Sequence, residues 1–292
     1  NVSFSLFRGE IHSLLGENGA GKSTMTKVAA GVYQLSSGSF VFEGKETTFL
    51  NPSEALNNGV VMVFQENSLV PNMTVSQNIY LGAENFFNSL AKLNIKASRF
   101  LQSLNFNVDP NLLVSQLGAA QKQMVEIARA VHHNAKVIIF DEPTATLTPE
   151  EKHHFFGLMQ RLKKEGVSIV FISHALEEAL EHSDRITVLR DGELIETDKA
   201  KNFNRERIVK AMIGRDLTDS AYASKKTARK KPRKRGKKTL EVENLSMGSM
   251  VKNSTFSAYS GQITGVFGLV GSGRTEMMKV VSGVYKRNIF HG

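Results

Sequence analysis

A loop of small and polar residues near the start of the chain has the composition of a phosphate-binding site. Residues 16–24 read Gly-Glu-Asn-Gly-Ala-Gly-Lys-Ser-Thr and fit the pattern G-x-x-x-x-G-K-[ST]. Glycines let backbone N–H groups turn toward phosphate oxygens, and the N-terminus of a following helix adds partial positive charge. We expect Lys22 to reach the β- and γ-phosphates of a nucleotide and the Ser23 hydroxyl to bind Mg²⁺. The predicted phosphate-binding residues are Gly16, Glu17, Asn18, Gly19, Ala20, Gly21, Lys22, Ser23 and Thr24.

Two carboxylates follow an apolar segment in the middle of the chain. Residues 137–140 read Val-Ile-Ile-Phe, and Asp141 and Glu142 come directly after them. A buried parallel strand brings the residues at its carboxyl end to the sheet edge where α/β folds bind ligands. We expect Asp141 to hold Mg²⁺, directly or through water, and Glu142 to act as general base on the attacking water. Alone, two acids after a strand could simply cap a helix, but combined with a phosphate loop they indicate nucleotide hydrolysis.

The spacing of apolar residues predicts the strands and helices around these residues. Gly31 and Gly166 lie just past two of the expected helices, where glycine commonly ends a helix. Strands alternating with helices favour a mainly parallel α/β sheet, and Arg190-Asp191-Gly192-Glu193 favours a hairpin. The expected strands are residues 2–6, 10–15, 39–42, 60–64, 137–140, 168–172, 186–189 and 194–197. The expected helices are residues 22–30, 52–58, 74–81, 97–104, 121–131 and 149–164.

Composition limits the class of protein. The 292 residues are 41% hydrophobic, enough for a sizeable core, and contain no cysteine, which excludes disulfides and thiolate metal sites. No apolar run approaches the ~20 residues of a membrane span. The net charge of +9 is concentrated, because ten of the 37 Lys and Arg residues lie between Lys225 and Lys238. We interpret this basic segment as a solvated linker, the alternative being contact with anionic lipid or nucleic acid.

The C-terminal part repeats the beginning of the chain. Residues 256–268 are similar to residues 4–16, and a second phosphate loop follows with Arg274 at the position of Lys22. We therefore expect a second, early-truncated copy of the domain from about Thr239. Because residue 1 falls inside an expected strand and is not Met, we expect a fragment truncated at both ends. The degenerate second phosphate loop comprises Gly268, Gly271, Gly273, Arg274 and Thr275.

Five motifs in a fixed order resemble the ATP-binding subunits of ABC transporters. They are the phosphate loop, Gln65 at a strand end, Asp141-Glu142-Pro143-Thr144, the loop at residues 145–148, and His174 after a strand. The resemblance implies a P-loop NTPase fold with a mainly parallel core sheet, an antiparallel β subdomain and a helical subdomain. It implies ATP and Mg²⁺ as ligands. It also implies that Gln65 contacts Mg²⁺, senses the γ-phosphate and couples to a membrane domain, and that His174 contacts the γ-phosphate and orients the water.

One motif departs from that family. The signature stretch, usually Leu-Ser-Gly-Gly-Gln, matches Leu117, Gly118, Ala119, Ala120 and Gln121. In the family, the serine hydroxyl and glycine N–H groups bind the γ-phosphate of the nucleotide on the partner domain. Gly118 has no hydroxyl, and the methyl groups of the two alanines hinder close approach. We therefore expect this signature to be impaired.

Two fused domains and Gly-Arg-Thr in the second phosphate loop resemble the simple-sugar importer subfamily, which takes up monosaccharides and polyols. The resemblance implies an ATPase on the cytoplasmic face of the cell inner membrane, bound peripherally to integral-membrane permease subunits. A periplasmic or extracellular solute-binding protein would be an indirect partner. The expected domains are residues 1–215, a basic linker at 216–238, and the start of a second nucleotide-binding domain at 239–292.

Two alternatives remain open from the sequence. Nucleoside importers share much of the pattern that favours a sugar. A soluble ABC-type ATPase acting on ribosomes or nucleic acid would use the basic linker as a contact. Such ATPases usually carry an intact signature, and the five Tyr and absent Trp provide no stacking platform, so no nucleic-acid partner is expected.

Overall fold

The computed structural model describes residues 2–64, 68–82, 90–133, 135–214, 236–248, 251–268 and 272–285. The chain forms two compact units, Asn1–Asp219 and Ser220–Gly292. Gln65, Gly271 and most of the expected linker lie outside the described residues.

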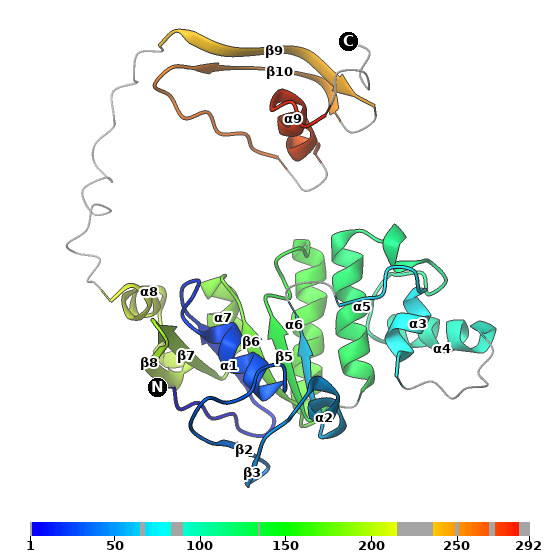
Figure 1. The fold of residues 1–292 in the computed structure, drawn as a ribbon, viewed down its shortest axis with the longest axis vertical. Coiled ribbons are helices and arrows are strands. Elements are labelled where there is room, and N and C mark those ends of the chain that lie inside the picture. Colours follow the sequence, from blue (N-terminus) through cyan, green and yellow to red (C-terminus); the bar gives the residue numbers. More distant parts are fainter. Residues whose placement is uncertain are drawn as a thin grey trace. The chain divides into compact units, whose positions relative to one another are not determined.

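A six-stranded sheet runs through the first unit (Figure 1). Its order is β4-β5-β6-β1-β7-β8, and every neighbouring pair is parallel except β7 and β8. This arrangement confirms the expected mainly parallel α/β sheet with a hairpin at one edge. The strands are β1 (Ile11–Leu15), β4 (Val60–Val63), β5 (Val137–Asp141), β6 (Ser168–Ile172), β7 (Arg185–Arg190) and β8 (Glu193–Lys199). A separate hairpin joins β2 (Phe40–Phe42) to β3 (Lys45–Thr47).

Helices cover both faces of the sheet, which explains why its central strands are apolar throughout. Along β5, Ile138 and Phe140 pack with α3, α4, α5 and α6, whereas Ile139 packs on the other face with α1 and α2. A third cluster joins β7 to α7 and α8. No helix among the described residues is long and apolar enough to span a membrane. The helices are α1 (Lys22–Ala29), α2 (Pro52–Asn57), α3 (Val75–Tyr80), α4 (Leu90–Ser103), α5 (Ala119–His132), α6 (Pro149–Lys164), α7 (Leu176–His182) and α8 (Arg205–Ile213).

Helix α6 begins and ends where its sequence predicts. The Thr148 side chain and Glu151 form a reciprocal capping box, and Pro149 occupies the first helical turn. Gly166, just past the C-terminus, has φ 88°, a left-handed conformation that glycine adopts without strain. These local signals fix the helix that connects the carboxylates after β5 to the start of β6.

Three expectations about elements were wrong or incomplete. Residues 2–6 do not form the expected strand, although Val2, Phe4 and Leu6 pack partly buried against the cluster of α1 and α2. The alternation predicted the inward side chains, but no described strand pairs with this segment, and a strand requires a partner. Helices α7 and α8 were not expected, and α4 begins at Leu90 rather than at Ala97.

The described residues of the second unit form a two-stranded antiparallel sheet and one helix. β9 (Lys238–Met247) pairs with β10 (Val251–Tyr259), and α9 spans Arg274–Val281. Its core is small and contains the buried Met247, Val251 and Met277. Residues 262–268, which match the β1 segment in the sequence repeat, do not form a strand.

Candidate active site

The predicted phosphate loop forms the turn between β1 and α1. Gly21 has φ 96° at the start of α1, in the left-handed region that favours glycine. Gly16 is required for space, because a Cβ atom there would lie 2.4 Å from the Leu189 carbonyl oxygen. No described side chain caps the first turn of α1, so its N–H groups remain available to an anion.

The Lys22 side chain lies inside this loop. Its ammonium donates hydrogen bonds to the carbonyl oxygens of Gly16 at 2.7 Å and Glu17 at 3.0 Å, and the residue is buried. Burial lowers the pKa of Lys22, while the nearby carboxylates of Glu142 and Asp141 act in the opposite direction. The cation is therefore confined between the loop and the two carboxylates.

Asp141 provides a buried acceptor next to the phosphate loop. It is 4% exposed, and its Oδ1 atom has no hydrogen-bond partner among the described residues. Burial raises the pKa of Asp141, and a hydrogen bond from the Ser23 hydroxyl partly opposes this effect. An unpaired carboxylate oxygen is costly in a protein interior, which indicates that it serves a ligand.

The pair of Asp141 and Ser23 fits Mg²⁺. This ion is commonly held by one or two carboxylates together with phosphate oxygens of the substrate, rather than by a set of protein ligands alone. In the described parts of the chain, no group of three or more His, Asp or Glu residues is suited to hold a metal ion. One carboxylate and one hydroxyl beside a phosphate loop match the donor set that Mg²⁺ with a nucleotide requires.

Glu142 and His174 meet at the same edge of the sheet. Glu142 follows β5, His174 comes shortly after β6, and these parallel strands are neighbours. The His174 Nε2 atom lies 2.5 Å from Glu142 Oε1. Because β1 is the other neighbour of β6, the carboxyl ends of three adjacent strands place Glu142, His174 and the phosphate loop together.

Sequence reasoning missed one residue at this edge. The Glu178 carboxylate on α7 accepts hydrogen bonds from Thr144 at 2.7 Å, Ser173 at 2.9 Å and Lys152 at 2.7 Å. Thr144 follows Glu142 closely, and Ser173 immediately precedes His174. Its only local signal would have been a short acidic helix after His174, which the apolar pattern did not predict.

The signature stretch is not brought to this site within the first unit. Gly118 precedes the first turn of α5, and the N–H group of Gly118 donates to the Gln121 side chain at 3.2 Å. Leu117 is buried in the cluster of α3 to α6, whereas α1 packs on the opposite face of the sheet (Figure 1). Ala119 and Ala120 begin α5.

The second phosphate loop reproduces part of the first. Helix α9 begins at Arg274, as α1 begins at Lys22, and Gly273 has φ 77°. The ammonium of Lys279, in the last turn of α9, lies 5.9 Å from the ring centroid of Tyr285 beyond the helix, and the matching distance from Lys27 to Tyr33 is 5.5 Å. Thr275 follows Arg274 in α9, while Gly268 has no strand before it. The repeat therefore extends from sequence to the geometry of the helix and its C-terminal turn.

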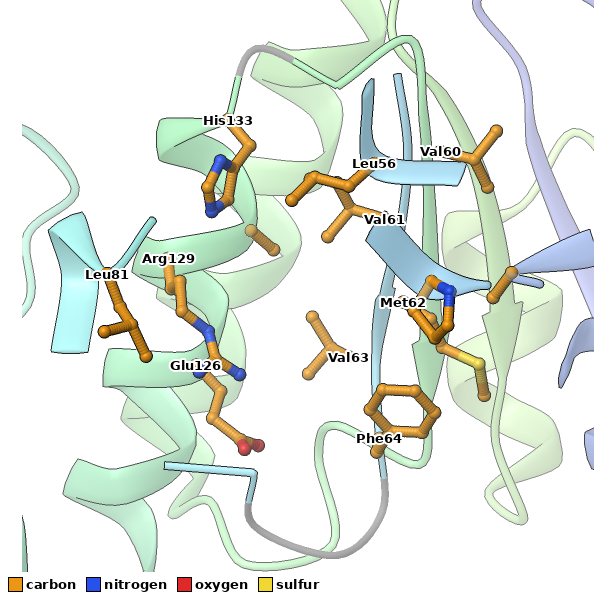
Figure 2. A pocket seen from close by; sticks show the side chains of 13 residues that line it. Leu56, Val60, Val61, Met62, Val63, Phe64, Leu81, Glu126, Arg129 and His133 are labelled. Carbon is orange, nitrogen blue, oxygen red and sulfur yellow. The ribbon is translucent and has the colours of Figure 1, made fainter. Parts of the chain in front are cut away.

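A groove of about 240 Å³ lies apart from the phosphate loop, between β4, α2 and α5. Figure 2 shows Val61 and Val63 on one side of it and Glu126 and Arg129 on the other. Burial raises the pKa of Glu126, and hydrogen bonds from Ser68 oppose this effect. Most of the lining is apolar. The lining residues are Ala30, Pro52, Leu56, Val60, Val61, Met62, Val63, Phe64, Leu81, Glu126, Arg129, Ala130 and His133.

Sequence comparisons relate the chain to known proteins. A family model described as ABC transporter matches residues 1–145. The chain is 40% identical to the ribose import ATP-binding protein RbsA of Geobacillus kaustophilus, over 97% of the chain and 57% of that protein. It is 41% identical to the galactose/methyl galactoside import ATP-binding protein MglA of Clostridium perfringens, over 100% of the chain and 57% of that protein. It is 39% identical to the xylose import ATP-binding protein XylG of Thermoanaerobacter pseudethanolicus, over 98% of the chain and 58% of that protein. The chain thus spans little more than half the length of these relatives.

Solved structures share the fold. A dimeric ATP-binding cassette in a post-hydrolysis state, bound to ADP and phosphate, superposes with a TM-score of 0.63 at 27% identity, covering 70% of this chain and 90% of that one. A nucleotide-free ATP-binding cassette from an ABC transporter gives a TM-score of 0.61 at 28% identity, covering 73% of this chain and 88% of that one.

Proposed function

The chain belongs to the ABC transporter family, and we propose that it is part of the ATPase that energises import of a simple sugar or sugar alcohol through a membrane permease. The contact between Glu142 and His174 carries this proposal, because these are the two side chains proposed as general base and orienting group for the attacking water. The import functions in the names of the relatives support the substrate class. We place the protein peripherally on the cytoplasmic face of the inner membrane.

Each residue of the site has a separate role in the proposed hydrolysis of ATP. Lys22 and the N–H groups at the start of α1 bind the β- and γ-phosphates. Ser23, Asp141 and Gln65 would hold Mg²⁺, which would neutralise charge that develops on the phosphates. Glu142 accepts a proton from water while the water oxygen bonds to the γ-phosphorus. The bond between the γ-phosphorus and the oxygen that bridges to the β-phosphate then breaks and releases ADP.

Replacing the proposed base tests the catalytic assignment. In the full-length transporter, Glu142→Gln should lower ATP turnover to less than about a tenth of wild type, since base catalysis contributes roughly 10²–10⁴-fold. ATP binding should persist, because the phosphate loop is unchanged. Glu177→Gln, at an exposed glutamate paired with Arg205, is the control and should leave turnover unchanged. Residual Glu142→Gln turnover above about a tenth of wild type would contradict the assignment.

The two composite sites of the full-length protein should be unequal. In a closed pair of domains, each ATP lies between the phosphate loop of one domain and the signature of the other. Arg274 has a planar, rigid guanidinium and does not replace a lysine ammonium at a phosphate. Lys22→Ala should therefore remove nearly all turnover, whereas Arg274→Ala should retain at least about half; equal losses would refute the asymmetry.

We propose the groove beside Phe64 as the surface on which the permease docks. Phe64 directly precedes Gln65, the residue expected to couple ATP to the membrane domain. The apolar lining suits a short apolar segment of the permease, and Glu126 suits a polar or basic group on that segment. Leu81→Glu should abolish co-purification with the permease while ATP binding persists. Leu50→Glu, at an exposed leucine outside the groove, is the matched control.

The substrate class is tested by uptake. A strain lacking the full-length gene should lose uptake of one labelled pentose, hexose or polyol. Loss of nucleoside uptake alone would instead favour a nucleoside importer. Purification with RNA and without an integral-membrane subunit would favour a soluble ABC-type ATPase, and contact of the basic linker with anionic lipid remains a secondary proposal.

A further inference from the structure

The Glu178 carboxylate joins three separate elements. Its Oε2 atom accepts hydrogen bonds from the hydroxyl groups of Thr144 and Ser173, at 2.7 and 2.9 Å. Its Oε1 atom accepts a hydrogen bond from the Lys152 ammonium on α6 at 2.7 Å. Thr144 and Ser173 are both buried, and the Glu178 side chain is 12% exposed. One side chain of α7 therefore bonds to the loop after β5, the loop after β6 and helix α6.

The Glu178 carboxylate is suited to accept these three hydrogen bonds because it remains ionised. Burial raises the pKa of Glu178, but the hydrogen bonds from Lys152, Thr144 and Ser173 outweigh burial and leave the pKa below its ordinary value. An ionised carboxylate only accepts hydrogen bonds, so both hydroxyl groups must point toward it. The Ser173 hydroxyl oxygen in turn accepts a hydrogen bond from the Ala175 N–H group at 3.0 Å.

The two bonded hydroxyl groups flank the reacting residues. Thr144 lies two positions after Glu142, and Ser173 immediately precedes His174. Glu142 itself has φ 53°, a conformation that costs a non-glycine residue on the order of 1 kcal/mol or more and that the surrounding structure must hold. A backbone hydrogen bond from Glu142 N–H to Ile172 O at 3.0 Å is one support. The Glu178 carboxylate is a second link, and it joins the loop after β5 to the loop after β6.

We propose that Glu178 is a positioning residue that sets the separation of Glu142 and His174 for ATP hydrolysis. This inference rests on the proposed function of those two residues. Glu178 does not touch the nucleotide but acts through Thr144 and Ser173. The required feature is an acceptor oxygen at the end of a side chain long enough to reach both hydroxyl groups.

Steady-state kinetics of the full-length protein with its permease tests the proposal. Glu178→Ala removes all three bonds and should lower kcat at least about tenfold, since a misplacement of about 1 Å can cost on the order of 100-fold. The KM for ATP should stay within about twofold, because the phosphate loop is unchanged. Glu178→Gln keeps an oxygen of the same reach and should retain kcat within about threefold. A loss of kcat in Glu178→Gln as large as in Glu178→Ala would overturn the proposal.

A second pair of variants tests the role if Glu178→Ala fails to fold. Thr144→Val removes one hydroxyl at constant shape and should lower kcat about fivefold or more, whereas Thr144→Ser should restore it. Glu177→Ala, the exposed neighbour, should leave kcat unchanged. Loss of kcat in Thr144→Ser equal to that in Thr144→Val would overturn the proposal, because the hydroxyl would then be irrelevant.

A double-mutant cycle separates positioning from general stability. In a His174→Ala background, Glu178→Ala should have little further effect on kcat, because the residue that it positions is already absent. Fully additive losses would overturn the proposal. Absence of ATP turnover in the wild-type complex would instead refute the proposed function, so the two failures are distinguishable.

Discussion

At the scale of single residues, the buried carboxylate of Asp141 lowers the stability of the fold but suits the binding of a ligand. Its Oδ1 atom is buried without a hydrogen-bond partner among the described residues, and such an atom costs about 1–3 kcal/mol. A stable fold without function would place an apolar residue there, in the interior between β5 and the phosphate loop. A divalent ion at this position would supply the missing interaction, and the nearby Ser23 hydroxyl already lowers the pKa of the same carboxylate.

The first prediction concerns that ion. Ser23→Ala removes the hydroxyl beside Asp141 and should weaken the Mg²⁺-dependent part of ATP binding about tenfold, which corresponds to ~1.4 kcal/mol. Binding of ATP in the presence of EDTA should be unchanged, because the Lys22 ammonium and the loop N–H groups remain. Calorimetric titrations with and without Mg²⁺ measure both quantities. Ser23→Thr keeps a hydroxyl and should bind as wild type does; equal losses with and without Mg²⁺ would exclude Ser23 as a ligand.

The second prediction concerns pH. Because the folded pKa of Glu178 is depressed, its ionised form adds stability above the unfolded pKa of 4.5, and this stability is lost as pH falls through the folded pKa. Glu178→Gln should therefore lower the free energy of unfolding by about 1–3 kcal/mol at pH 7, and this difference should shrink as pH falls below 4.5 and become small only below the folded pKa. Lys152 and His182, the other titratable groups that interact with Glu178, are present in both proteins. Urea unfolding of wild type and Glu178→Gln at several pH values measures this difference. A difference in unfolding free energy that does not change with pH would contradict the prediction.

Residue patterns predicted the members of the site that directly follow strands but not those that depend on packing. Asp141 ends a strand, and Lys22, Glu142 and His174 come after strands, so a parallel sheet gathers the four residues at one edge. The three donors to Glu178 lie 34, 26 and 5 positions from it in sequence, and only the packing of α7 brings them together. No local spacing encodes such a contact.

At the scale of elements, the most reliable predictions combined a strong local signal with a partner inside the chain. α6 has a capping box, a proline in its first turn and a glycine beyond its end, and its boundaries were as expected. Residues 2–6 had an equally clear alternation, yet they form no strand. The matching segment of the second unit lies in β10 and pairs with β9, so the difference is the presence of a partner strand.

The third prediction compares two glycines. Gly31 has φ 70°, and a Cβ atom there would lie 2.6 Å from the Asn51 carbonyl oxygen. Gly31→Ala should lower the free energy of unfolding by about 2–4 kcal/mol, because strain and backbone overlap add. Gly157 lies in the middle of α6 with no atom within 4 Å of a Cβ position. Gly157→Ala should instead raise stability by about 0.5–1 kcal/mol. Chemical denaturation measures the free energy of unfolding of both variants. A similar loss of stability in Gly31→Ala and Gly157→Ala would refute the distinction.

At the scale of the whole chain, the repeat places the same sequence pattern in two environments. β1 is bonded to β6 on one side and β7 on the other, and Ile11 and Leu15 are fully buried. The matching residues of the second unit, Ile263 and Phe267, are fully exposed. In the first unit, both neighbours of β1 come from segments more than 150 residues later in the sequence. A central parallel strand is therefore specified by its neighbours and not by its own pattern.

The last prediction follows from this contrast and requires only the 292-residue chain. The backbone amides of β1 should exchange with solvent deuterium only when the first unit unfolds, because both edges of the strand are bonded. With an unfolding free energy of about 5 kcal/mol or more, exchange should be slowed at least ~10³-fold. Amides of residues 262–268 form no strand and should exchange nearly at the rate of an unstructured peptide. Peptide-resolved hydrogen exchange compares the two copies in one sample, with α1 and α9 as an internal comparison of matched helices. Equal protection of β1 and residues 262–268 would contradict the prediction, because it would require that the second copy acquires neighbouring strands in solution.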